Sequence, residues 1–121
     1  MTQSLAQNRR KVWSTAKAGA IQRLTLIEEE LPELADDEVE TTVKAVGLNF
    51  ADIFAITGLY SATPEGRFIP GLEYSGVVNR VGKNCSRFKV GDRIMAVSRF
   101  GGYASIIQSK EDYLVPLPND W

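Results

Sequence analysis

The sequence predicts a mainly β fold, a sandwich or barrel of antiparallel strands with one short helix. Short apolar runs recur about every 8–12 residues with turn residues between them, which is typical of all-β domains. Only residues 49–57 carry apolar side chains at the three- and four-residue spacing of a helix. The repeated strand–helix units of a doubly wound parallel sheet are missing.

The first strands are expected to form a hairpin. Residues 11–16 and 21–28 are its predicted strands, and Lys17-Ala18-Gly19-Ala20 is the turn between them. Strand pairing should stop near Pro32, because proline has no N–H for a β-ladder.

The third strand is predicted over residues 39–46, where apolar and polar side chains alternate as in a half-buried strand. The period then changes to that of a helix. Asn49 is a suitable N-cap, and Asp52 stands at the third position, as in a carboxylate variant of the capping box. Gly58 suits the left-handed position that follows a helix.

The second half of the chain reads as a loop followed by short strands. Residues 59–69 are the expected loop, Gly71 and Gly76 are interpreted as turn and bulge glycines, and a tight Gly-Asp turn stands at 91–92. The predicted strands cover residues 73–81, 94–97, 103–108 and 113–117.

Composition excludes several classes of function. With 14 Lys and Arg against 15 Asp and Glu, the net charge of −1 offers no basic field for nucleic acid or an anionic membrane. No apolar run approaches the roughly 20 residues of a membrane span. The start of the chain has no apolar stretch of signal-peptide length, and Cys85 is the single cysteine, so we expect a cytoplasmic protein.

The missing residue types are informative. Without histidine and with one cysteine, the chain cannot assemble a tetrahedral zinc site of N/S ligands or a Ser-His-Asp triad. Gly71 and Gly76 have the spacing of a phosphate-binding P-loop, but Val77 stands where the lysine is needed. Since no G-x-G-x-x-G is present either, the chain alone is not a dinucleotide-binding domain.

An ordered set of five blocks resembles one family. The blocks resemble the zinc-independent quinone oxidoreductases of the medium-chain dehydrogenase/reductase superfamily over residues 12–118: Ala45 to Asp52, Thr57 to Tyr60, Ile69 to Val78, Val81-Gly82 with Val90 to Ile94, and Gly101 to Ala104. The resemblance implies a GroES-like, partly open antiparallel β-barrel with one principal short helix. We expect residues 1–11 to be a flexible lead-in and residues 12–121 a GroES-like catalytic-domain fragment, with the nucleotide-binding Rossmann domain absent.

The resemblance also implies site residues. Alcohol dehydrogenases of this superfamily carry zinc-ligating residues where Asn49 and Leu72 stand here, so the likeness is to the metal-free branch. It places Asn49, Tyr60 and Phe54 beside the cofactor and Tyr60 and Glu73 in the substrate pocket, with Asn49 as the candidate catalytic residue.

Each of these residues has a simpler interpretation. Asn49 can be a plain helix cap and Tyr60 a packing aromatic, while Phe54 lacks the hydroxyl that some relatives carry there. Glu73 can be a solvent-facing carboxylate or a partner of Arg67 or Arg93.

The implied activity of the full-length protein is hydride transfer from NADPH to a quinone, an enone or a related small-molecule carbonyl, without zinc. A full-length homodimer is expected, and the isolated fragment should be inactive. Two alternatives stay open: an enoyl-reductase module of a polyketide or fatty-acid synthase, and a non-catalytic GroES-like binding module.

Overall fold

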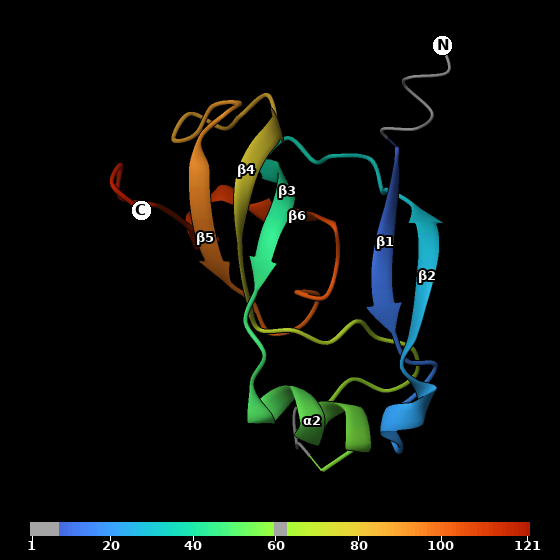
Figure 1. The fold of residues 1–121 in the computed structure, drawn as a ribbon. Coiled ribbons are helices and arrows are strands. Elements are labelled where there is room, and N and C mark those ends of the chain that lie inside the picture. Colours follow the sequence, from blue (N-terminus) through green and yellow to red (C-terminus); the bar gives the residue numbers. More distant parts are fainter. Residues whose placement is uncertain (1–7, 60–62) are drawn as a thin grey trace.

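The computed structural model describes residues 8–59 and 63–121, and its strands form two antiparallel sheets (Figure 1). A hairpin of β1 (Arg9–Ser14) and β2 (Thr25–Glu30) stands beside a five-stranded sheet of order β6-β3-β4-β5-β7. The sheets do not close into a barrel, and this part of the chain has one α-helix, so the expected partly open β fold is confirmed. The elements of the larger sheet and its connections are β3 (Glu38–Val46), α2 (Phe50–Thr57), β4 (Glu73–Val81), β5 (Arg93–Val97), β6 (Ile106–Lys110) and β7 (Leu114–Pro116).

The hairpin forms as predicted, but its strands are shifted: β1 covers residues 9–14 instead of 11–16, and β2 covers residues 25–30 instead of 21–28. β1 begins at Arg9, so part of the expected lead-in of residues 1–11 is strand. Residues 21–23 form a 3₁₀ turn, η1 (Ile21–Arg23), instead of the start of β2. In this turn the Arg23 N–H donates to the Ala20 carbonyl at 3.1 Å, which removes that group from the ladder.

Charge pairing accounts for the extension of the hairpin at its open end, to Arg9 and Glu30. The basic start of β1 lies opposite the acidic end of β2, and Arg9 pairs with Glu28 at 2.7 Å. Glu29 accepts from both Arg10 and Arg67, each at 2.7 Å. Opposite charges facing each other across an antiparallel pair stabilise the pairing, so β1 and β2 continue to Arg9 and Glu30.

The strands β3 and β4 form the centre of the larger sheet. β4 has the predicted bounds, whereas the simple alternation predicted for residues 39–46 is wrong in part. Glu40, predicted to face outward, is 3% exposed, and two register shifts interrupt β3 against β4. A glycine is needed at position 76 of β4, because a Cβ there would overlap the Thr42 carbonyl of β3.

The last strands start later than predicted. Residues 103–105 do not belong to β6; Ala104 instead bridges to Val12 of β1. Residues 111–113 form a second 3₁₀ turn, η2 (Glu111–Tyr113), which displaces the start of β7 to Leu114. The bridge to Val12 is one of the links that hold the hairpin against the larger sheet.

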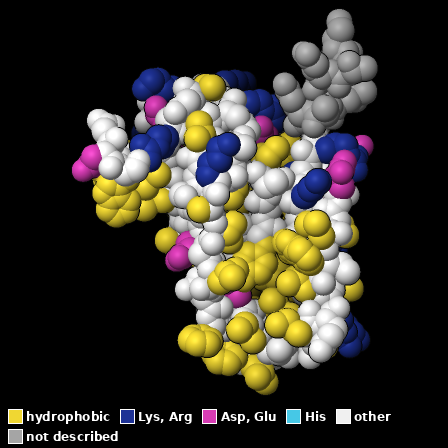
Figure 2. All heavy atoms as spheres, viewed as in Figure 1, with side chains coloured by type: hydrophobic (Ala, Val, Ile, Leu, Met, Phe, Trp, Pro, Cys, Tyr) yellow, Lys and Arg dark blue, Asp and Glu magenta, His cyan; other side chains and the backbone are white. Residues whose placement is uncertain are grey.

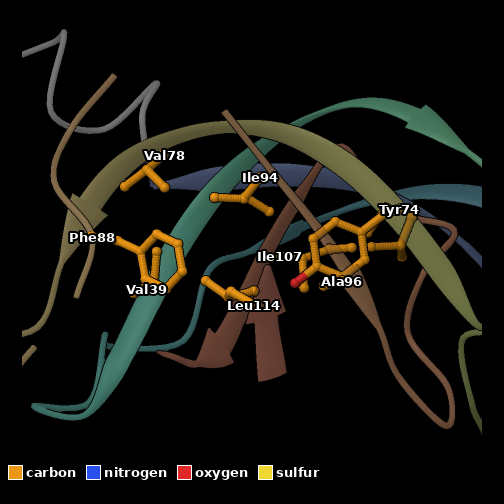
Figure 3. Packing of buried hydrophobic residues seen from close by; sticks show 10 residues of the cluster. Val39, Tyr74, Val78, Phe88, Ile94, Ala96, Ile107 and Leu114 are labelled. Carbon is orange, nitrogen blue, oxygen red and sulfur yellow. The ribbon is translucent and has the colours of Figure 1, made fainter. Parts of the chain in front are cut away.

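The core lies inside the curve of the larger sheet (Figure 3). Side chains from β3, β4, β5, β6 and β7 meet there with Phe88 from a turn and Val12 from the hairpin. The buried members of the cluster are Val12, Val39, Tyr74, Val78, Phe88, Ile94, Ala96, Ala104, Ile107 and Leu114. Because α2 contributes none of them, the helix is free to present side chains at the edge of the fold.

Candidate functional site

Asn49 begins the helix α2, as predicted. Its backbone is extended, with φ −131° and ψ 152°, and Asn49 and Asp52 occupy the N-cap and N3 positions of a capping box. The Asn49 backbone N–H donates to Asp52 Oδ2 at 3.0 Å. At the other end, Gly58 has φ +83° in the left-handed region, so both predicted helix ends are confirmed.

The side chain of Asn49 has an unused donor. Its Nδ2 atom is buried and has no hydrogen-bond partner among the described residues. Buried polar groups are nearly always hydrogen-bonded, and leaving one unpaired costs about 1–3 kcal/mol. Among the described residues, Asn49 Nδ2 is one of five buried side-chain polar atoms without a partner, and it is the one that belongs to the start of α2.

The surroundings of Asn49 are apolar. A hollow of about 520 Å³, here named the Asn49 hollow, is lined by Leu48, Asn49, Phe50, Ile53 and Tyr103. Leu48 and Phe50 are 79% and 80% exposed, and apolar side chains gather over this end of the molecule in Figure 2. Apolar walls around a few convergent polar groups are typical of small-molecule sites.

A second apolar hollow, the hairpin groove, adjoins the first. Its volume is about 460 Å³, and it shares Leu48 and Tyr103 with the Asn49 hollow. The remaining lining comes from the hairpin, β3 and the segment before β6: Lys11, Trp13, Leu24, Leu26, Val46, Ala104 and Ser105. Trp13 is 44% exposed along this groove.

Tyr103 joins the helix to the rest of the fold, and the sequence did not single it out. Its hydroxyl donates to Asp52 Oδ2 at 2.7 Å, and Asp52 is 2% exposed. Burial and this hydrogen bond raise the pKa of Tyr103 well above its usual range. Its place in the Gly-Gly-Tyr-Ala block was the one available signal, and that block was interpreted only as a family marker.

The structure does not gather all the predicted site residues into the Asn49 hollow. Phe54 lies on α2, 48% exposed, and is not among the residues that line the hollow. Tyr60 lies outside the described residues.

Glu73 is exposed at the start of β4, and its carboxylate packs against Gly47, two positions before Asn49. It lines a separate groove of about 840 Å³ with Arg93 and Trp121. No ion pair joins it to Arg67 or Arg93 in the part of the chain that the structure describes, where Arg67 pairs with Glu29. The solvent-facing interpretation of Glu73 therefore matches its position.

Two negative findings apply to residues 8–59 and 63–121. No three His, Cys, Asp or Glu side chains in these ranges are grouped so that they could bind a metal ion. None of the helices in the same ranges has the length and apolar character needed to cross a bilayer.

Comparison with known proteins identifies similar sequences and folds. Residues 35–119 match the family described as the alcohol dehydrogenase GroES-like domain. The human "Synaptic vesicle membrane protein VAT-1 homolog-like" is 32% identical over 102 residues, which are 84% of this chain. A "Highly reducing polyketide synthase" of Didymella fabae is 35% identical over 113 residues, or 87% of this chain.

Among solved structures, the quinone oxidoreductase of Escherichia coli complexed with NADPH superposes with a TM-score of 0.83 and 30% identity over 93% of this chain. The chain spans a minor part of each relative: 24% of the human protein, 6% of the polyketide synthase and 34% of the Escherichia coli chain. The match over residues 35–119 contains Asn49, Asp52, Glu73 and Tyr103.

Proposed function

The chain belongs to the alcohol dehydrogenase GroES-like domain family and is quinone oxidoreductase-like, and from this premise we propose that it forms one wall of the active site of an NADPH-dependent reductase. The substrate is a quinone, an enone or a related conjugated carbonyl. The nucleotide-binding domain would be supplied by sequence outside these 121 residues.

The unpaired amide of Asn49 carries this proposal. Asn49 Nδ2 is a buried donor without a partner among the described residues, and it belongs to a hollow with otherwise apolar or aromatic walls. A donor held by the start of a helix in such a hollow is already in position. It can polarise a substrate carbonyl oxygen, or bind the carboxamide of a nicotinamide, without a further loss of side-chain entropy.

The residues of this chain fit one end of a nicotinamide cofactor. Asn49 offers the hydrogen bond, and Leu48, Phe50 and Ile53 supply apolar walls around it. A bound NADPH would supply the hydride. The sequence contains no glycine-rich G-x-G-x-x-G turn for the pyrophosphate, so this chain would contact only the nicotinamide end. Phe54 and Tyr60 remain candidates for cofactor contact, and Tyr60 and Glu73 for substrate contact.

Zinc independence is part of the proposal. The sequence has no histidine and one cysteine, and Asn49 is a poor ligand for zinc compared with a thiolate. Hydrogen-bond donors such as the Asn49 amide would then take over the polarisation that a metal ion supplies elsewhere. A cytoplasmic full-length homodimer completes the proposal.

One alternative has a specific observation in its favour. The similarity to a polyketide synthase over 113 residues supports an enoyl-reductase module, which would reduce an enoyl thioester instead of a free quinone. Comparing the turnover of NADPH with a quinone, a simple enone and an enoyl thioester distinguishes the two substrate classes.

The test uses Asn49 variants of the longer protein that contains this chain and its nucleotide-binding domain. Asn49→Ser keeps a capping oxygen but loses the amide donor, whereas Asn49→Ala loses both and should cost about 0.5–2 kcal/mol of stability. We expect the Ser variant to unfold as the parent does and to lose about tenfold in kcat/KM, equivalent to about 1.4 kcal/mol. Normal kinetics in a stable Ser variant would reduce Asn49 to a helix cap and contradict the proposal.

A further inference from the structure

We propose that Tyr103 is a positioning residue that fixes Asn49 through the buried carboxylate of Asp52. The inference rests on the proposed function, since it assigns Tyr103 a part in placing the Asn49 amide. Its physical content, a hydrogen-bonded link from the 101–104 segment to the start of α2, can be tested separately.

One carboxylate oxygen connects the two residues. Asp52 Oδ2 accepts from the Tyr103 hydroxyl at 2.7 Å and from the Asn49 backbone N–H at 3.0 Å. Asp52 is 2% exposed, so water does not compete freely for that oxygen. Hydrogen bonds to an ionised carboxylate are short and roughly twice as strong as neutral ones, so the oxygen holds both donors in place.

Tyr103 is itself held on both sides of its backbone. Its N–H donates to the Pro70 carbonyl at 2.9 Å, and its carbonyl accepts from the Trp13 N–H at 2.9 Å. The preceding Gly102 lies directly against Gly71, with 2.6 Å between the Gly102 Cα and the place of a Cβ on Gly71. The tyrosine is therefore anchored to the hairpin and to the segment before β4, while its hydroxyl reaches the helix.

The ring and the hydroxyl of Tyr103 have separate tasks. The ring lines both the Asn49 hollow and the hairpin groove, whereas the hydroxyl donates a hydrogen bond to Asp52. Because burial and the Asp52 hydrogen bond raise the pKa of Tyr103, the hydroxyl stays a donor throughout the neutral range. A phenylalanine would keep the wall of both hollows and lose only the link to Asp52.

A purely structural role for the hydroxyl predicts something different. If Tyr103 only adds stability, its loss weakens the whole fold, and local opening increases at both ends of α2 alike. A positioning role predicts an effect confined to the first turn, because Asp52 and Asn49 lie there and the last turn is closed by other bonds. At that end the Gly58 and Leu59 N–H groups donate to Ala55 and Phe54 at 3.1 and 2.8 Å.

The experiment measures amide hydrogen exchange in the 121-residue chain for Tyr103→Phe, with Tyr113→Phe as the matched control. Tyr113 is 61% exposed, so the control removes a hydroxyl from the surface. We expect exchange of the Asn49 backbone N–H to accelerate at least tenfold in Tyr103→Phe, the Asn49 side-chain amide resonances to shift, and Gly58 and Leu59 to change less than twofold. The control should match the parent chain. Uniform acceleration along α2, or no change at Asn49, would overturn the proposal.

A kinetic readout in the longer protein separates this inference from the proposed function. There, Tyr103→Phe should lower kcat/KM for NADPH-dependent carbonyl reduction at least fivefold, and Tyr113→Phe should leave it unchanged. If the parent protein shows no reductase activity, the proposed function fails, and hydrogen exchange alone still decides whether Tyr103 positions Asn49. If exchange changes selectively while kcat/KM of an active parent is unaffected by Tyr103→Phe, the positioning has no catalytic consequence and the inference is wrong.

Discussion

Glu40 is the residue whose environment departs most from its sequence pattern. Its side chain is 4% exposed, accepts two hydrogen bonds from Arg80 at 3.0 and 2.6 Å, and accepts a third from Gln108 at 3.0 Å. Burial alone would raise the pKa of Glu40, but the hydrogen bonds from Arg80 and Gln108 outweigh it and leave that pKa lowered. A buried carboxylate is stable in this strand because its oxygens are paired.

Removing the cation should therefore be costly. Arg80→Met keeps the aliphatic stem and leaves Glu40 without its charged partner, so we expect a loss of about 1–3 kcal/mol in the free energy of unfolding at pH 7. Lys83→Met is the control, because Lys83 and Asp36 form an exposed pair, 76% and 56% exposed at 3.5 Å, and its loss should cost less than about 0.5 kcal/mol. Urea unfolding of both variants measures the difference.

The stability cost of Arg80→Met should also depend on pH, in a direction that the lowered pKa of Glu40 determines. Since the pKa of Glu40 is lowered in the folded chain, its contribution is present above the unfolded value of 4.5 and is lost as the pH falls below that value. The cost of Arg80→Met should accordingly shrink between pH 7 and pH 3. A cost that is independent of pH, or equal to that of Lys83→Met, would show that the Glu40–Arg80 pair does not stabilise the strand.

At the scale of elements, the approach of the segment before β4 to the segment before β6 depends on two glycines. Gly71 has φ +112°, and a Cβ there would lie 2.6 Å from the Gly102 Cα and 2.7 Å from the Tyr103 backbone nitrogen. The interpretation of Gly71 as a turn glycine is confirmed by its φ, and the backbone contact adds a second reason for it.

Gly71→Ala should therefore lower the free energy of unfolding by more than the strain of a positive φ alone would cost. Gly66 provides the comparison, because its φ is +75° and a Cβ there would meet nothing within 4 Å. We expect Gly66→Ala to cost about 1–2 kcal/mol and Gly71→Ala about 3 kcal/mol or more in urea unfolding. Equal costs for the two variants would mean that the segments separate easily and that Tyr103 is not rigidly anchored.

Elements defined by local pattern were predictable. The helix with its cap at Asn49 and its end at Gly58 follows from residues that are neighbours in sequence, as does the strand over residues 73–81. Two of the departures from prediction, at Glu40 and Tyr103, depend on partners that are distant in sequence. Glu40 can be buried because it pairs with Arg80, which is 40 positions later in the sequence. Tyr103 donates to Asp52, which is 51 positions earlier. Periodicity carries no information about such pairs, because it records only which side of an element is apolar.

At the scale of the whole molecule, the fold presents two apolar hollows that share Leu48 and Tyr103, with Asn49 in one of them. The core cluster inside the larger sheet contains no residue of α2, so the helix start can serve a site at the edge of the domain. A hollow open on one side has to be completed by another domain before it can exclude water, which agrees with a chain that spans a minor part of its relatives.

We propose that this chain builds one wall of a reductase active site and needs a nucleotide-binding domain to complete it. The most direct test is the steady-state oxidation of NADPH with 1,4-benzoquinone or an enone, measured for the 121-residue chain and for the longer protein that contains it. We predict saturable turnover by the longer protein, unaffected by a zinc chelator, and none by the chain alone. Saturable turnover by the isolated chain, or a longer protein that is inactive with both acceptors, would show that the chain is not one wall of such an active site.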